Sequence, residues 1–153
     1  MKRTLLIFLL PLVMFSAAIA DSPNMMGIRL GTYTDLEEPY LGVEFLTGIG
    51  PNIDINPNFE YVLTDIGTFY TLNFDAHVDI YTVRRGPFTW VGAGLAYASF
   101  DPDGPIEGDS DLGLNLFLGV GLDRPGFVPY VQLKFIIGDY DDTVLNAGLR
   151  FRL

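Results

Sequence analysis

The chain has 153 residues, of which 49% are hydrophobic and 18% are charged, so it has room for one domain of ordinary size. It contains no Cys and a single His, which excludes thiolate metal sites, cysteine nucleophiles and sites built from paired histidines. The formal net charge of −10 argues against nucleic-acid binding, because neutralising phosphates requires a basic surface.

Residues 1–20 have the features of a secretory signal peptide. Lys2 and Arg3 form the basic start, an apolar run follows, and Ala18-Ile19-Ala20 offers a small-residue cleavage site. The run is near the short limit for a spanning helix, so an N-terminal membrane anchor is the less favoured alternative. We expect residues 21–153 to form the mature domain, whose charge falls from −10 to about −12 because removal of the peptide takes away two cations and no acid.

Hydrophobic residues alternate with period two in eight stretches after residue 25, and Gly, Pro, Asp and Asn fill the gaps between them. No segment shows a convincing helical period. The predicted strands cover residues 26–34, 40–49, 58–64, 69–83, 88–99, 112–122, 128–137 and 143–153. Pro129 is the exception, because a closed sheet has no edge strand and a Pro is then expected at the first position of its strand.

Each predicted strand has one face that is nearly all apolar, as in the alternate residues Leu112, Leu114, Leu116 and Leu118. The other face mixes glycine, charge and large aromatics. Its members include Arg29, Gly31, Glu44, Glu60, Asp75, His77, Asp79, Tyr81, Trp90, Gly92, Gly94, Asn115, Phe117, Gly119, Gly121, Tyr130, Gln132, Lys134, Asn146, Gly148, Arg150 and Arg152.

Two architectures fit this alternation. A soluble lipocalin-like barrel turns its apolar face inward around a small ligand, whereas a membrane barrel turns it outward to lipid. The mixed face has one Lys and several large aromatics beside glycines, which is typical of a narrow barrel interior and not of a surface in water. The sequence therefore predicts an all-β fold, an eight-stranded antiparallel up-and-down transmembrane β-barrel, and the soluble binder is the alternative.

The charged residues predicted to face the lumen balance one another, so they can pair inside the barrel. This balance matters because an eight-stranded barrel is just wide enough for side chains, and an unpaired buried charge costs several kcal/mol. The predicted polar network of the lumen consists of Arg29, Glu44, Glu60, Asp75, His77, Asp79, Lys134, Arg150 and Arg152.

The gaps after the first, third, fifth and seventh strands share one end of such a barrel, the outward-facing one when both termini lie in the periplasm. These gaps contain acids and no base. The acids are Asp35, Glu37, Glu38, Asp65, Asp101, Asp103, Glu107, Asp109, Asp111, Asp139, Asp141 and Asp142. The excess negative charge is therefore predicted to lie on one rim.

Five short segments resemble the small outer-membrane β-barrel proteins of Gram-negative bacteria, the OmpA-like and OmpX-like transmembrane domains, across residues 26–153. The segments are Phe59-Glu60-Tyr61, Val91–Tyr97, Leu118–Leu122, Val128–Val131 and Ala147–Phe151. The resemblance implies a monomeric outer-membrane barrel with no cofactor. It also implies recognition of the C-terminal strand by the assembly machinery, although the family usually ends in Phe and this chain ends in Leu153, two residues after Phe151.

Asp101, Asp103, Glu107, Asp109 and Asp111 are candidate ligands for Ca²⁺ or Mg²⁺, because hard cations bind clustered carboxylate oxygens. A solvated acidic loop is the simpler interpretation. Divalent cations held loosely at these acids would bridge the protein to phosphates of lipopolysaccharide, the partner expected beside membrane lipid.

Asp75, His77 and Asp79 also invite a metal or acid–base interpretation. A hydrogen-bonded plug is favoured, because alternate side chains on one straight strand diverge too far to chelate one ion. A lipid A-modifying enzyme would need a Ser beside His77, and no Ser lies near it in sequence. We therefore expect a non-catalytic structural or surface-interaction protein, with the soluble binder and the enzyme as alternatives.

Overall fold

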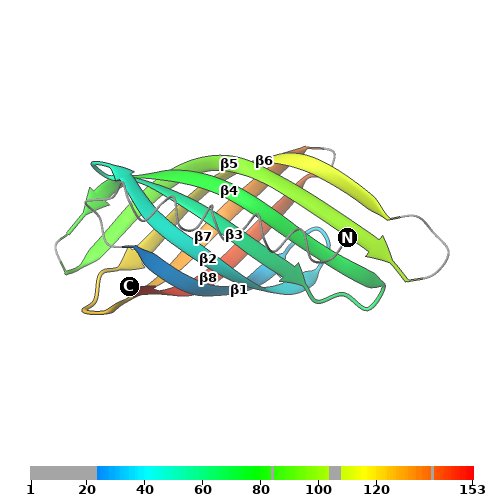
Figure 1. The fold of residues 1–153 in the computed structure, drawn as a ribbon, viewed down its shortest axis with the longest axis horizontal. Helices are drawn as coiled ribbons and strands as arrows, with labels where there is room; N and C mark the ends of the chain where they lie inside the picture. The colour runs from blue at the N-terminus through cyan, green and yellow to red at the C-terminus, as the bar shows by residue number, and fades with distance from the viewer. Residues whose placement is uncertain (1–23, 84, 104–107, 139) are drawn as a thin grey trace.

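The computed structural model describes residues 24–83, 85–103, 108–138 and 140–153, so the predicted signal peptide lies outside the described residues. Eight antiparallel strands follow one another around a closed barrel in which β1 pairs with β8 (Figure 1). This confirms the predicted fold. The strands are β1 (Met25–Tyr33), β2 (Glu38–Gly50), β3 (Ile53–Val62), β4 (Gly67–Thr82), β5 (Pro87–Pro102), β6 (Asp109–Leu122), β7 (Phe127–Gly138) and β8 (Asp142–Arg152).

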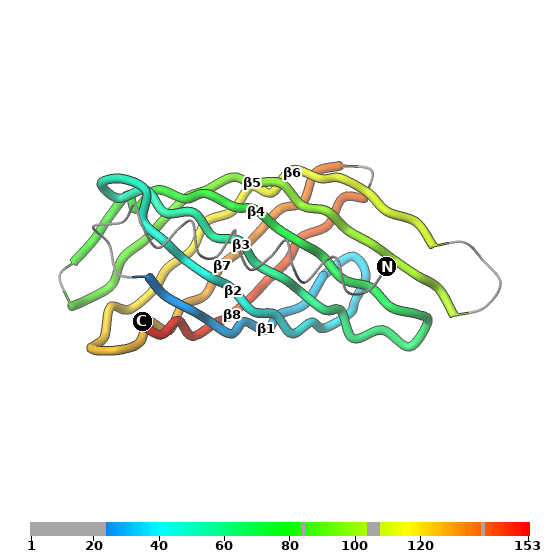
Figure 2. The backbone as a smooth tube through the Cα atoms, in the orientation of Figure 1, coloured from blue at the N-terminus to red at the C-terminus, as the bar shows by residue number. Residues whose placement is uncertain are grey.

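Each connection joins neighbouring strands, so alternate connections lie at opposite ends of the barrel. We call the end with the β2–β3, β4–β5 and β6–β7 connections the turn end, and the opposite end the loop end. The start of β1 and the end of β8 both lie at the turn end (Figure 2). The β5–β6 hairpin reaches farthest at the loop end (Figure 1). Among the described residues, no helix is long and apolar enough to cross a bilayer.

The apolar face of the strands is the outer face of the barrel. Leu114 and Leu116 are 55% and 47% exposed, whereas Glu44 and Arg150 are only 3% and 2% exposed. A soluble binder that encloses a ligand needs the reverse orientation. The lipocalin-like alternative is therefore wrong for this fold.

Strand β3 begins earlier than the sequence pattern predicts, at Ile53 and not at residue 58. Its first half carries the amides Asn56 and Asn58 on the inner face and Pro57 on the outer face, so the apolar alternation that marks the other strands is weak there. The extension has a consequence for the lumen, because Asp54 becomes a strand residue that pairs with His77 of β4.

Pro129 is the third residue of β7, so the expectation that it occupies the first position is wrong. The β6–β7 ladder begins only at Tyr130, and residues 127–129 pair with β8 alone. The strand is locally an edge there, which is where the sheet tolerates a residue without an N–H.

Tyr81 lies on the outer face, 58% exposed, and not in the lumen as predicted. The β4–β5 register shifts between Asp79 and Tyr81, since Asp79 pairs with Trp90 and Tyr81 with Thr89. A bulge of this kind adds one residue to one strand, and the side chains beyond it change face.

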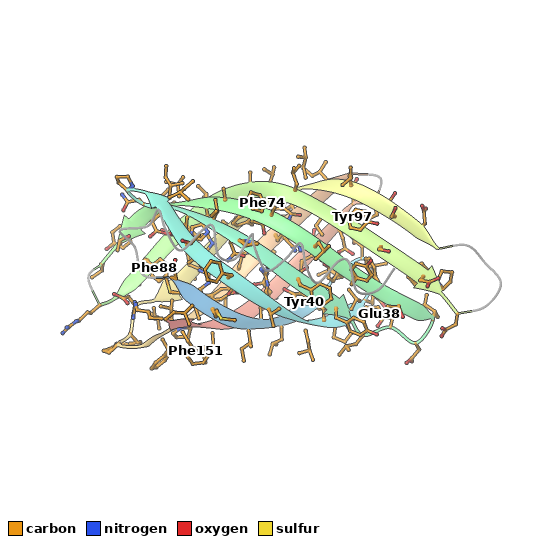
Figure 3. The ribbon with its side chains drawn as sticks, in the orientation of Figure 1. Glu38, Tyr40, Phe74, Phe88, Tyr97 and Phe151 are labelled. Atoms are coloured by element: carbon orange, nitrogen blue, oxygen red, sulfur yellow. The ribbon has the colours of Figure 1, made fainter. Side chains whose placement is uncertain are left out.

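Aromatic clusters fill the lumen at both ends. At the turn end, Trp90 packs between Phe88 and Tyr130, with ring centroids 5.2 and 5.8 Å away. At the loop end, the Tyr33 ring lies 5.5 Å from that of Tyr40 and 5.9 Å from that of Phe69. Figure 3 shows Phe88 toward one end and Tyr40 toward the other. Polar side chains occupy the lumen between these two clusters.

Candidate functional site

A group of buried ions occupies the middle of the lumen, and we call it the central ionic cluster: Arg29, Glu44, Glu60, Lys134 and Arg150. The Glu60 carboxylate lies 2.8 Å from Lys134 Nζ and 3.2 Å from Arg29 Nη2. It also accepts hydrogen bonds from the hydroxyls of Tyr33, at 2.5 Å, and Thr71, at 3.1 Å. Glu60 is therefore paired by charge and saturated by donors, as a buried carboxylate requires.

Glu44 has an equivalent set of partners toward the turn end. Arg150 donates through Nε at 3.0 Å and Nη2 at 3.1 Å, a bidentate arrangement. Asn56 and the Tyr130 hydroxyl each donate at 2.7 Å. Arg29 lies between the two glutamates, 3.9 Å from Glu44, and links them into one network.

Asp75 does not join the ionic cluster through an ion pair. Its carboxylate accepts hydrogen bonds from Asn58 at 2.9 Å and from Asn115 at 2.8 Å. Asn115 also donates to Asn73 at 2.8 Å, and Asn73 donates in turn to Thr71. The amides of Asn115 and Asn73 therefore link Asp75 to the Thr71 hydroxyl, which donates to Glu60.

Arg152 lies outside the lumen. It pairs with Asp123 at the turn end, where both side chains are about one-third exposed, and it also donates to the Arg124 carbonyl. The strand parity places Arg152 inside, but β8 ends there and the side chain turns to solvent. Inside the barrel, carboxylates therefore outnumber the three cations Arg29, Lys134 and Arg150, and they include those of Glu44, Asp54, Glu60, Asp75 and Asp79.

His77 and Asp79 lie together, as predicted, but their nearest acid is Asp54 of β3 and not Asp75. His77 Nε2 is 3.4 Å from Asp54 Oδ2. Asp54, His77 and Asp79 are the His and acid residues of the described chain that approach closely enough to share one ion.

The loop end collects the acidic residues. The exposed ones in the described part of the chain are Asp35, Glu37, Asp65, Asp101, Asp103, Asp109 and Asp141. Asp142 differs, because it is buried and accepts hydrogen bonds from the backbone amides of Asp35 and Leu36. Glu107 and Asp139 lie outside the described residues. The Ca²⁺ or Mg²⁺ patch therefore stays a prediction.

A hollow of about 320 Å³ opens at this end. Phe69, Phe100 and Tyr140 contribute aromatic rings to it, while Asp109 and Asp111 add carboxylates. Burial raises the pKa of the Tyr140 phenol, which therefore stays neutral. The hollow combines apolar walls with negative charge, a composition suited to cationic groups.

The two serines of the described residues lie far from the imidazole. Ser99 and Ser110 pair with each other at the loop end of the β5–β6 hairpin, whereas His77 pairs with Gly92 toward the turn end. Seven residue pairs along the ladder separate these positions, about 23 Å at the usual rise of a strand. Among the described residues, no serine therefore approaches the imidazole.

Several residues that donate hydrogen bonds to the buried carboxylates were not among the predicted lumen residues. Tyr33, Asn56 and Asn58 follow the inward parity of their strands, so extending the predicted third strand would have found the two amides. Asp54 could be found only from the β3–β4 register, because nothing in the sequence places it opposite His77.

No family model and no curated protein matches this chain. Several solved structures are similar to it. The N-terminal β-barrel domain of OprF from Pseudomonas aeruginosa has a TM-score of 0.73 at 14% identity, covering 86% of this chain and 98% of that domain. The Neisserial surface protein NspA has a TM-score of 0.66 at 14% identity, covering 85% and 96%.

The outer membrane protein Ail of Yersinia pestis is also similar, with a TM-score of 0.54 at 13% identity, over 85% of this chain and 99% of that one. At identities this low, the similarity shows only that the folds are alike. The resemblance to the small outer-membrane barrels is confirmed at that level: the chain is an eight-stranded β-barrel of the outer-membrane type.

Proposed function

We propose that this chain is an integral protein of a Gram-negative outer membrane, exported by its signal peptide, with the turn end in the periplasm and the loop end at the cell surface. The observation that carries the proposal is the apolar outer face around a closed, charge-filled interior. Outward side chains such as Leu30, Leu95 and Leu145 are more than half exposed, which water disfavours and lipid does not. A closed barrel also pairs its strands without leaving an edge, as the bilayer interior requires.

The role that this geometry supports best is non-catalytic: a structural or surface-interaction protein with a plugged lumen. The central ionic cluster and the aromatic clusters at both ends fill the lumen with side chains, which supports a barrel that does not conduct ions. The acidic loop end supports an interaction with lipopolysaccharide, whose phosphates would be bridged to the carboxylates by Ca²⁺ or Mg²⁺. Phe151 and Leu153 are exposed on the outer face, where the assembly machinery would recognise the last strand.

Cell fractionation tests the membrane assignment. We expect the protein to be extracted from the outer membrane only by detergent and to migrate on gels at a position that changes on boiling. Leu116→Arg, in the middle of β6, should lower the free energy of unfolding in bilayers by about 2–4 kcal/mol, and Leu112→Arg near the loop end by about 0–1 kcal/mol. Release of the protein in soluble form, or equal costs for the two substitutions, would contradict the assignment.

The rim interaction needs a separate test. We expect the barrel to bind lipopolysaccharide vesicles in Mg²⁺ and to release them in EDTA. Replacing Asp35, Asp65 and Asp103 together by Asn should weaken this binding, because all three are exposed at the loop end. Asp123→Asn removes a carboxylate at the turn end and serves as the control. If binding changes neither on removal of Mg²⁺ nor in the triple variant, the proposed interaction with lipopolysaccharide is refuted.

A further inference from the structure

Two acids and the imidazole converge where β3 and β4 pair at the turn end. Asp54 lies directly opposite His77, and Asp79 follows His77 on the inner face of β4. One ligand atom of each residue lies within 4.8 Å of the other two. His77 Nε2 lies 3.4 Å from Asp54 Oδ2. Two strands thus bring together three donors that one strand would hold apart.

One carboxylate oxygen of this group is not satisfied by the protein. Oδ1 of Asp79 is buried and has no hydrogen-bond partner in the described part of the chain. The nearby cation, Arg150, is engaged by the Glu44 carboxylate. Glu44, Glu60 and Asp75 each accept at least two hydrogen bonds, so Asp79 differs from these three acids. A buried carboxylate oxygen without a partner is costly, and a cation would remove that cost.

The surroundings of the imidazole suit a ligand. His77 is 2% exposed, and its ring centroid lies 5.7 Å from that of Trp90 and 6.5 Å from that of Phe117. This packing fixes the ring and lowers the local dielectric constant, which strengthens an electrostatic bond. The Asp54 side chain is 18% exposed, so an ion has access to the group from the aqueous turn end.

We propose that Asp54, His77 and Asp79 bind a divalent transition-metal ion, with Zn²⁺ as the preferred occupant. Imidazole nitrogen and carboxylate oxygen are both ligands of Zn²⁺ in proteins, and three such ligands leave the fourth tetrahedral position to water. A tetrahedral ion with bonds of about 2.0–2.1 Å holds its ligands about 3.3 Å apart, close to the separation of His77 and Asp54. Ca²⁺ and Mg²⁺ prefer six or more oxygen ligands, so a site with three donors that include an imidazole favours Zn²⁺ over them.

The bound ion stabilises the turn end of the barrel. It balances the two carboxylates and ties β3 to β4 immediately before the register shift between Asp79 and Tyr81. The site lies at the opposite end from the acidic rim, so it is independent of the surface role proposed above. Because the ion binds the folded barrel, stability should rise with its concentration.

The wild-type protein contains its own reporters. His77 is the only His of the chain and Trp90 the only Trp, so their signals need no assignment in a barrel purified without a histidine tag. We expect Zn²⁺ to shift the imidazole resonances of isotope-labelled His77 until one ion is bound per barrel. We expect Co²⁺ to quench Trp90 fluorescence and Zn²⁺ to reverse the quenching.

Variants then locate the ligands. His77→Gln and Asp79→Asn should each weaken Zn²⁺ binding by about tenfold or more, since even indirect partners of a metal contribute that much. Asp123→Asn is the matched control, because it removes one carboxylate from the same end without touching the group. Boiling-dependent gel migration verifies that each variant is folded, and Zn²⁺ should raise the melting temperature of the wild type and the control only.

Several results would overturn the site. Imidazole resonances that stay unchanged in excess Zn²⁺ would refute it in the wild type, whether or not any variant folds. Equal Zn²⁺ affinity in the wild type and Asp79→Asn would show that Asp79 is not a ligand, and this result would refute the proposed site. A loss in Asp123→Asn as large as that in Asp79→Asn would show diffuse attraction to an acidic end and no site.

Discussion

Removing the charge of Glu60 should lower the free energy of unfolding more than removing the charge of its partner Lys134. Glu60→Gln keeps the shape of the side chain but leaves Lys134, which is fully buried, without the carboxylate it binds at 2.8 Å. Leaving a buried charge unpaired costs about 3–5 kcal/mol. Lys134→Met should cost less, about 1–3 kcal/mol, because Glu60 keeps Arg29 at 3.2 Å and the Tyr33 hydroxyl.

Combining the two substitutions measures the interaction between Glu60 and Lys134 apart from their contacts with other residues. If the two groups stabilise the barrel mainly through each other, Glu60→Gln combined with Lys134→Met should cost about 2 kcal/mol less than the sum of the single costs. Urea unfolding in phospholipid vesicles measures these values, with Trp90 fluorescence as the signal. Asp103→Asn, an exposed acid of the loop end, is the control and should change stability by less than about 0.5 kcal/mol.

Additive costs would refute the coupling. Single costs below about 1 kcal/mol would show that water reaches the pair and that the lumen is not the dry, plugged interior described above. A larger cost for Lys134→Met than for Glu60→Gln would contradict the role given to Arg29 as the second cation of Glu60.

Two further pairs of substitutions test the packing of the lumen, both by the same unfolding assay. Tyr33→Phe should cost about 1.5–3 kcal/mol because its hydroxyl donates to a carboxylate, whereas Tyr140→Phe should cost under about 0.5 kcal/mol because its buried hydroxyl has no partner among the described residues. Gly119→Ala should cost about 1–3 kcal/mol because the added methyl group overlaps the Trp90 ring, and Gly50→Ala, with no atom within 4 Å, should be neutral. Equal costs within either pair would contradict these contacts.

The strand number, the two faces of the sheet and the acidic end could all be predicted from the order of the amino acids. Period-two alternation places Leu114 and Glu44 on opposite faces, and the glycines and large aromatics on the face of Glu44 predict that this face is the inner one, as its burial confirms. The same rule brings Arg29, Lys134 and Arg150 into one narrow lumen with Glu44 and Glu60, because eight strands leave room only for side chains.

The contacts between lumen residues could not be predicted in this way, because they depend on how the strands are aligned in the folded barrel. Alternation fixes the face of a residue but not its height against the neighbouring strand, and height depends on register, bulges and strand ends. The β3–β4 register places Asp54 opposite His77. The register shift after Asp79 turns Tyr81 to the outer face. Because β8 ends at Arg152, this side chain pairs with Asp123 outside the lumen. The position of Arg152 outside the lumen and that of Asp54 inside it leave more carboxylates than cations in the barrel, and the β3–β4 register brings Asp54 beside the single imidazole.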